Sequence, residues 1–185
     1  MIIGITGSFG TGKTTVAKMF GDLGAHVIDA DKIVHSFINA KARKELSKIV
    51  FRRKAYLEFI CKLVHPIVIT KIKEEIQRLN PKKTVIVIDA PLLIESGLHK
   101  MVEVLVVVKT EKETQVKRAM KRLGLDRSSV LKRMRFQMPL KKKIKMADFI
   151  IDNESGMSQT RKQVKDIWKK IILGRHKSAA LNYAD

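Results

Sequence analysis

The residues from Gly7 to Thr14 are GSFGTGKT and fill the pattern G-x-x-x-x-G-K-[ST] of a phosphate-binding loop. Glycines in such a loop let backbone N–H groups turn toward phosphate oxygens without Cβ clashes. Lys13 can reach the β and γ phosphates, and the Thr14 hydroxyl can ligate Mg²⁺. The pattern therefore predicts a nucleoside triphosphate site. Its expected nucleotide contacts are Gly7, Gly10, Thr11, Gly12, Lys13, Thr14 and Thr15.

Both flanks of the loop support this interpretation. Ile2, Ile3 and Ile5 are typical of a buried strand, and residues 16–23 show a helical pattern. A helix that begins near Lys13 directs its positive end at the bound anion. The alternative is a Gly-rich turn that only links a strand to a helix, and such a turn does not need all four specified residues.

Two carboxylates are expected at the same edge of the sheet as the loop. Asp31 follows a short strand at 26–28, and Asp89 ends the apolar run 85–88. In parallel α/β sheets, ligands bind outside the carboxyl ends of the strands. Asp89 is therefore expected to support Mg²⁺, directly or through water, and Asp31 to act as general base toward an attacking hydroxyl. Purely structural roles remain open for both, and Asp29 is either functional or a helix N-cap.

Strands alternate with helices along the chain, which predicts an α/β fold with a parallel sheet and helices on both faces. Five strands are expected, at 2–7, 26–28, 85–88, 102–109 and 147–153. Helices are expected at 13–23, at 32–63 with interruptions near 39–44 and 51–54, from a break at His65-Pro66 to 79, at 111–122, 126–146 and 159–173. Gly174 is expected to end the last helix.

The stretch 32–80 contains no strand signal and is expected to be an inserted helical subdomain. We expect a single domain over residues 1–175 and a flexible tail over 176–185. No apolar run has membrane-spanning length and no signal-peptide pattern opens the chain, so a cytoplasmic protein without a membrane partner is expected. Cys61 is the only cysteine, and its apolar surroundings favour a core position over a catalytic thiol.

The formal net charge is +20 over 185 residues. Such a charge suits binding to nucleic acid or to small polyanionic substrates, and part of it can be a solvated face. Aromatic residues make up only 5% and no aromatic-rich basic motif is present, so we expect no nucleic-acid partner. The basic segment at 111–147 is expected to be a lid. Most of its lysines should be solvated, while two or three of its arginines contact phosphate, because Arg makes bidentate contacts.

A set of segments in a fixed order resembles the dephospho-coenzyme A kinase family, over residues 2 to about 172. These are ITGSFGTGKTTVAKMF, LGAHVIDAD, KIVF, LVHPIV, VIDAPLLIESGL, QVKRAMKR and RFQMPLKKKIKMADFIIDN. The loop alone occurs in many families. The combination of D-A-D, H-P, P-L-L-x-E and Q-M-P with A-D-F-I-I-D-N, in this order, is specific to the family that the chain resembles.

The resemblance implies a P-loop nucleoside-kinase-like fold: a five-stranded parallel sheet with a helical acceptor subdomain and a helical lid. It implies ATP-dependent phosphorylation of the ribose 3′-hydroxyl of dephospho-coenzyme A, the last step of coenzyme A biosynthesis, with Mg²⁺ and small-molecule substrates. A monomer or small homo-oligomer is expected. The implied catalytic residues are Asp31, Lys13, Arg118 and Arg122, and Arg133 is a further candidate for phosphate contact. Thr14 and Asp89 are implied to bind the metal, and Asn153 the adenine. The implied acceptor-binding residues are Asp31, His65, Leu92 and Glu95.

Two features depart from the family pattern. The segment between Asp31 and Val50 is shorter than usual, and Ile94 replaces the more usual aromatic residue. Other classes also remain open. The nearest alternative is a nucleoside monophosphate kinase-like phosphotransferase, and a basic nucleic-acid-binding NTPase is a different kind of protein. A GTPase switch is disfavoured because the chain has no D-x-x-G and no N-K-x-D.

Overall fold

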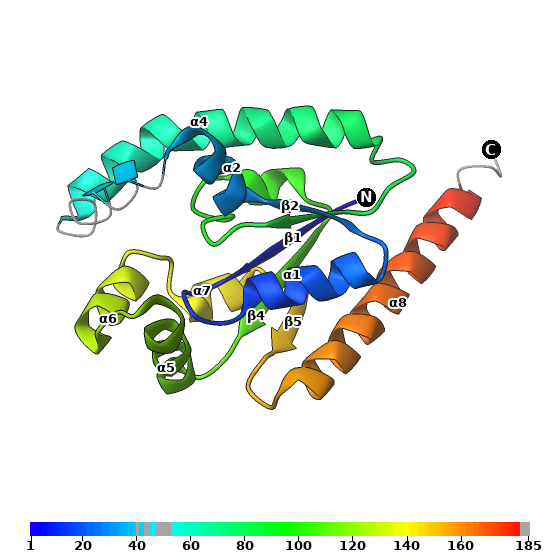
Figure 1. Ribbon diagram of the computed structural model, residues 1–185. Coiled ribbons are helices and arrows are strands. Elements are labelled where there is room, and N and C mark those ends of the chain that lie inside the picture. Colours follow the sequence, from blue (N-terminus) through cyan, green and yellow to red (C-terminus); the bar gives the residue numbers. More distant parts are fainter. Residues whose placement is uncertain (40, 43–44, 47–52, 182–185) are drawn as a thin grey trace.

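Five parallel strands form the centre of the computed structural model, which describes residues 1–39, 41–42, 45–46 and 53–181. The strand order is β2-β3-β1-β4-β5 (Figure 1). The three middle strands are mostly apolar, as expected where helices cover both faces of a sheet. The predicted five-stranded parallel sheet is confirmed. The strands are β1 (Ile2–Gly7), β2 (His26–Asp29), β3 (Ile86–Asp89), β4 (Val104–Lys109) and β5 (Phe149–Asp152).

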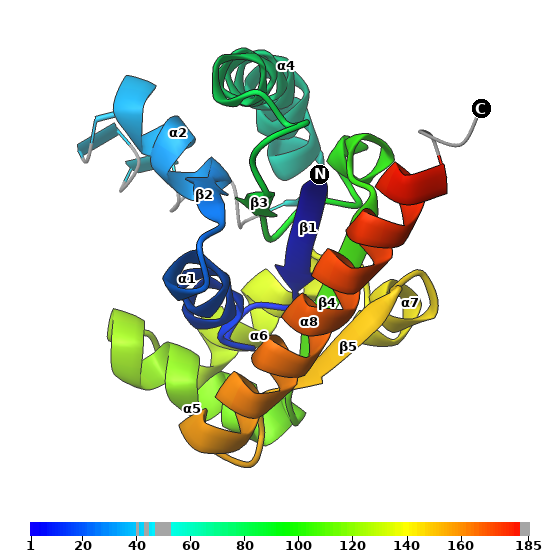
Figure 2. The same cartoon turned by 90° about the vertical axis from the view of Figure 1, so that its right-hand side faces the viewer.

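Helices cover the sheet on two sides, each with its own hydrophobic core (Figures 1 and 2). On one side, α1 (Lys13–Asp22) and α8 (Met157–Leu181) pack on the sheet through side chains such as Phe20 and Val164. On the other side lie α2 (Ala30–Phe37), α4 (Lys54–Leu79) and the 3₁₀ helix η1 (Leu98–Met101). Because β1 is the central strand, the phosphate-binding loop that follows it lies at the middle of the sheet edge.

Helix α4 continues through Pro66, so the predicted break at His65-Pro66 is wrong. A proline inside a helix removes one backbone hydrogen bond and costs about 3 kcal/mol. Val68, Ile72 and Ile76 bury the next turns against the sheet, and each such side chain contributes about 1.5–3 kcal/mol. Packing thus outweighs the local penalty. Helix α2 ends at Phe37 and α4 begins at Lys54. Parts of the interruptions expected near 39–44 and 51–54, and the whole KIVF segment, lie outside the described residues.

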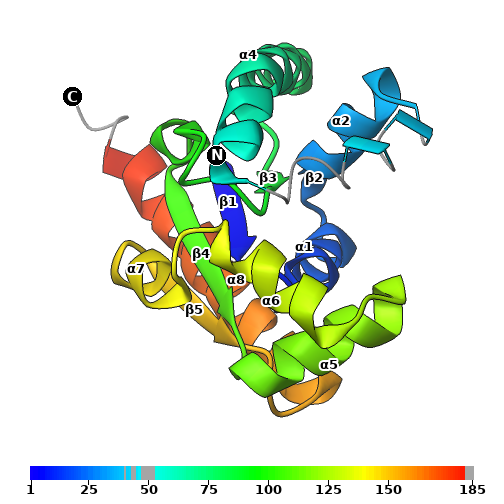
Figure 3. The same ribbon diagram turned by 90° about the vertical axis from the view of Figure 1, so that its left-hand side faces the viewer.

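The predicted lid contains α5 (Lys112–Leu123), α6 (Arg127–Arg135) and α7 (Leu140–Lys145). Figure 3 shows α5 and α6 side by side. One continuous helix over 126–146 was expected, but the chain leaves the helix after Arg135. Pro139 explains this break, because proline disfavours helical backbone at the preceding residue. Asp126 caps α6 by accepting a hydrogen bond from Ser129 N at 2.8 Å.

The last helix also differs from the expectation, because α8 runs past Gly174 to Leu181. A glycine ends a helix when it takes up left-handed backbone, and Gly174 is not among the glycines with positive φ. Residues 182–185 of the predicted tail lie outside the described residues. Within the described chain, no helix has the length and apolar character to cross a membrane.

Candidate active site

The loop between β1 and α1 is a cradle of backbone. Gly10 and Gly12 have φ of +84° and +85°, a left-handed conformation that favours glycine. A Cβ on Gly10 would lie 2.4 Å from the Gln115 carbonyl oxygen, and one on Gly12 would lie 2.3 Å from Asn153 Nδ2. These positions therefore have no room for a side chain. Helix α1 begins at Lys13, so the free N–H groups of its first turn point toward the space that the loop encloses, where an anion can bind.

The loop is held from outside by two side chains that come from distant parts of the sequence. Asn153 Nδ2 donates to the Thr11 carbonyl at 2.8 Å, and Asn153 Oδ1 accepts from the Thr160 hydroxyl at 2.8 Å. The backbone N–H of Phe9 donates to Gln137 Oε1 at 2.7 Å. The amide of Asn153 thus holds the loop, and its expected contact with adenine stays a prediction. Gln137 was not identified as a site residue from the sequence.

A cavity of about 170 Å³ lies between the loop and α5. It brings five of the predicted loop residues together with two predicted arginines of the lid, whereas Gly7 and Thr11 do not line it. Arg118 also donates to the Asn153 backbone carbonyl at 2.9 Å. Arg133 has a different place, with its guanidinium 5.8 Å from the centre of the Phe9 ring. This donor cavity is lined by Gly10, Gly12, Lys13, Thr14, Thr15, Arg118, Ala119 and Arg122.

Strand pairing places the carboxylates beside the loop. Asp29 and Asp89 are paired across β2 and β3, and Asp89 is paired with Ile5 of β1. Asp29 caps α2 by accepting from Lys32 N at 3.1 Å, which is the N-cap role that the sequence left open. Asp31 follows in the first turn of α2.

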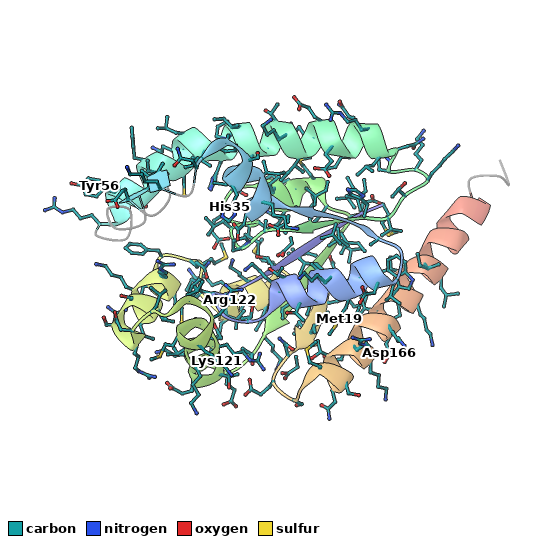
Figure 4. All side chains as sticks on the ribbon, viewed as in Figure 1. Met19, His35, Tyr56, Lys121, Arg122 and Asp166 are labelled. Carbon is teal, nitrogen blue, oxygen red and sulfur yellow. The ribbon has the colours of Figure 1, made fainter. Side chains whose placement is uncertain are left out.

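Burial raises the pKa of Asp31, and Lys13 opposes this shift more than any other charge. The residue is exposed, but the protein atoms that surround its carboxylate weaken the hydration of the charged form. Asp29 raises the pKa further, whereas Arg122 of the lid lowers it. A carboxylate with a raised pKa is a better proton acceptor, as a general base requires. His35 on α2, which is labelled with Arg122 in Figure 4, also lowers the pKa of Asp31.

Asp89 is 3% exposed, and burial raises its pKa while Lys13 and a hydrogen bond from Thr14 lower it. Its Oδ1 atom has no hydrogen-bond partner among the described residues. An unsatisfied carboxylate oxygen next to a threonine hydroxyl fits Mg²⁺, which prefers oxygen ligands and keeps several waters. The described part of the chain holds no cluster of three metal-ligating side chains, which Mg²⁺ does not require. Thr14 and Asp89 are therefore suited to support the ion.

A second cavity, of about 340 Å³, lies between α2, α4 and the segment after β3. We call it the acceptor cavity. Its wall is mostly apolar and includes the predicted acceptor residues Asp31, His65 and Leu92. Partial burial lowers the pKa of His65, which favours the neutral imidazole. Cys61 lines this cavity and is only partly buried, rather than enclosed in the core as expected.

Glu95 does not line the acceptor cavity. Its carboxylate forms an ion pair with Lys143, at 3.0 Å from Oε1 to Nζ, and accepts from the backbone N–H of Met138 at 2.9 Å. The predicted acceptor contact of Glu95 therefore stays untested, while the structure gives its carboxylate other partners. Most lysines of the lid segment were expected to be solvated, but Lys143 is fully buried.

Residues 1–42 and 39–159 match the family model described as dephospho-CoA kinase. The two matches overlap at 39–42, inside the segment that the sequence comparison with the family pattern predicts to be shortened. The dephospho-CoA kinase of Aquifex aeolicus is 34% identical over 91% of this chain and 96% of its own length. That of Fusobacterium nucleatum is 35% identical over 89% of this chain and 95% of its own length.

Solved structures agree with the sequence relatives. The dephospho-CoA kinase from Campylobacter jejuni has a TM-score of 0.65 at 28% identity, covering 94% of this chain and 98% of its own. A Thermus thermophilus protein, TT1252, has a TM-score of 0.75 at 30% identity, covering 92% and 97%. Shikimate kinase from Acinetobacter baumannii, at 19% identity, shares the fold with a TM-score of 0.60, covering 94% and 93%.

Proposed function

The chain belongs to the dephospho-CoA kinase family, and we propose that it transfers the γ-phosphoryl group of ATP to the ribose 3′-hydroxyl of dephospho-CoA. The observation that carries this proposal is the position of Asp31. It lines the acceptor cavity, and the ammonium of Lys13, which lines the donor cavity, lowers its pKa. The carboxylate of Asp31 thus lies on the acceptor cavity within electrostatic reach of Lys13, which supports a role in directing an acceptor hydroxyl toward a γ-phosphoryl group held by the loop.

The donor side holds the triphosphate. Backbone N–H groups of the loop and the start of α1 bind the phosphates, and Lys13 neutralises charge that spreads over the γ-phosphoryl oxygens. Arg118 and Arg122 reach the same cavity from the lid helix α5, where they can clamp the transferring group. Mg²⁺ supported by Thr14 and Asp89 supplies further charge neutralisation when bound.

The acceptor side orients the hydroxyl. The apolar wall of the acceptor cavity suits a nucleobase, and its volume lies within the usual range for small-ligand pockets. Asp31 accepts a hydrogen bond from the 3′-hydroxyl and takes its proton as the oxygen attacks phosphorus. A closing lid excludes water from the γ-phosphoryl group, because a wet site hydrolyses ATP instead of transferring the phosphoryl group. The proposal includes a cytoplasmic protein acting as a monomer or small homo-oligomer.

A direct assay of the product tests this proposal. The protein is incubated with ATP, Mg²⁺ and dephospho-CoA, and the product is analysed by mass spectrometry and ³¹P NMR. We expect one new phosphomonoester on the ribose 3′-oxygen, and no product from Lys13→Ala. Equal or faster transfer to AMP or CMP would contradict the proposed acceptor and support the nucleoside monophosphate kinase-like alternative.

A further inference from the structure

Lys143 on α7 is fully buried, which is rare for lysine unless its charge is paired. Its Nζ donates to the Pro91 carbonyl at 2.7 Å and to Thr6 Oγ1 at 3.4 Å. The same atom lies 3.0 and 3.1 Å from the two carboxylate oxygens of Glu95. Burial lowers the pKa of Lys143, and the charge of Glu95 and its hydrogen bond oppose that shift. One ammonium group therefore joins three separate segments of the chain.

Each of these segments belongs to a different part of the site. Thr6 is the last residue before Gly7, where the phosphate loop begins. Pro91 lines the acceptor cavity and lies two residues after Asp89. Lys143 itself belongs to α7, the helix at the base of the lid. The distances around its Nζ thus fix the loop, the cavity wall and the lid base relative to one another.

The linker between α6 and α7 carries the connection further. Met138 N donates to Glu95 Oε1 at 2.9 Å, and the preceding residue, Gln137, accepts from Phe9 N of the phosphate loop at 2.7 Å. Gln137 is therefore bonded to the phosphate loop, and the adjacent Met138 is bonded to Glu95 in the segment after β3. A shift of this linker should move both segments together.

We propose that Lys143, acting through Glu95 and Pro91, is a positioning residue that aligns the acceptor cavity with the phosphate loop and the lid. This inference rests on the proposed phosphoryl transfer. Misalignment by about 1 Å can slow a reaction about 10²-fold, because the attacking oxygen no longer lies in line with the phosphorus. Water also attacks in line, but it is not held by the acceptor cavity and can reach the γ-phosphoryl group from solvent. Loss of the pair should therefore reduce transfer more than ATP hydrolysis.

An ion pair whose ammonium group is buried can also serve stability alone, and the two roles are separable. Glu95→Gln leaves the buried ammonium of Lys143 without its ion pair, and Lys143→Met leaves the partly exposed carboxylate of Glu95 without its partner, so each single change destabilises the fold. Replacing both partners by neutral groups of similar shape removes that penalty. The double variant Lys143→Met/Glu95→Gln therefore recovers stability relative to either single variant. Its carboxamide still accepts from Met138 N, but the bonds from Lys143 to Pro91 and Thr6 are lost.

The test compares Lys143→Met, Glu95→Gln and the double variant with Lys142→Met, which changes an exposed lysine on the same helix. Urea unfolding, KM for dephospho-CoA, kcat and the ratio of ATP hydrolysis to transfer are measured. We expect the double variant to unfold near the wild-type midpoint, yet to show KM raised about tenfold and a hydrolysis-to-transfer ratio raised by a similar factor. Lys142→Met should match wild type in all four.

Wild-type KM and ratio in the stable double variant would overturn the positioning role and leave only a structural one. If no Lys143 variant folds, Thr6→Val removes the hydroxyl that bonds to Pro91 and Lys143, with Thr6→Ser as its control. The ratio should then rise in Thr6→Val alone, and an unchanged ratio would refute the proposal. Wild-type protein that hydrolyses ATP but transfers nothing to dephospho-CoA would refute the proposed function itself. A raised hydrolysis rate without acceptor in the double variant would still support alignment of the lid by Lys143.

Discussion

The side chain of Asn153 bonds to Thr11 and Thr160, and we call these two hydrogen bonds the clamp on the phosphate loop. Asn153→Asp changes one atom of this clamp. Asn153 is 5% exposed, and its Nδ2 donates to the Thr11 carbonyl at 2.8 Å. An aspartate has the same shape but presents a carboxylate oxygen to that carbonyl at neutral pH. The hydrogen bond becomes a repulsive contact between two oxygens. The bond from Thr160 to Oδ1 is kept, so the substitution tests one half of the clamp.

The cost follows from the buried charge and the lost bond. A typical hydrogen bond contributes about 1 kcal/mol, and an unpaired buried polar group costs about 1–3 kcal/mol more. We expect a loss of about 3 kcal/mol in the free energy of unfolding near pH 8. At 1.36 kcal/mol per pKa unit, this equals a folded-state pKa about 2 units above the unfolded value near 4. Arg118, bonded to the Asn153 carbonyl at 2.9 Å, limits the penalty.

The sign of the pH effect is specific. When the folded-state pKa of an acid is raised, the folded state binds more protons, so the free energy of unfolding rises as pH falls from about 6 to about 4. The protonated carboxyl then donates to Thr11. In urea unfolding, the difference in the free energy of unfolding between the variant and wild type should shrink as pH is lowered from 8 to 4.5. The ATP affinity of the variant should recover over the same range. Thr160→Val is the control, with a pH-independent loss. A difference for Asn153→Asp that does not change with pH, or that stays below about 0.5 kcal/mol, would refute the clamp.

Three further predictions concern single residues. Asp31→Asn should lower kcat by about 10² or more without changing ATP affinity; it should also abolish the acid limb of the kcat profile, which the raised pKa places above that of a free aspartate. Gly10→Ala should weaken ATP binding more than tenfold in calorimetry, because its Cβ meets the Gln115 carbonyl at 2.4 Å, whereas Gly24→Ala has a similar φ and open space and should bind ATP normally. Asp126→Ala should lower the melting temperature at pH 7, and this difference should shrink as pH falls from about 4 toward about 2, because hydrogen bonds from Ser128 and Ser129 lower the pKa of Asp126 to about 2.

Local patterns were sufficient for the donor side of the site. The phosphate loop, the strands around it and the carboxylates at their ends depend on residues close together in sequence, and parallel strands bring these ends to one edge. Asp29, Asp31 and Asp89 accordingly meet as the strand pattern predicts. The acceptor cavity was foreseen only in part, through His65 and Leu92.

Long-range contacts were beyond the reach of the same patterns. Lys143 lies in a run of lysines that is typical of a solvated face, yet it is buried and contacts Glu95, 48 residues away in sequence. Gln137 and Phe9 are 128 residues apart. Pro66 signals a helix end locally, yet tertiary packing keeps α4 continuous. In each case the deciding free energy comes from segments that are distant in sequence.

The central claim is that Asp31 joins an ATP site to an acceptor site built for dephospho-CoA. The most direct measurement is kcat/KM for dephospho-CoA, AMP and CMP, side by side with ATP and Mg²⁺, in wild type and Asp31→Asn. We expect a strong preference for dephospho-CoA and at least about a 10²-fold loss of that transfer in the variant. Comparable rates with all three acceptors, or near-wild-type transfer by Asp31→Asn, would contradict the claim.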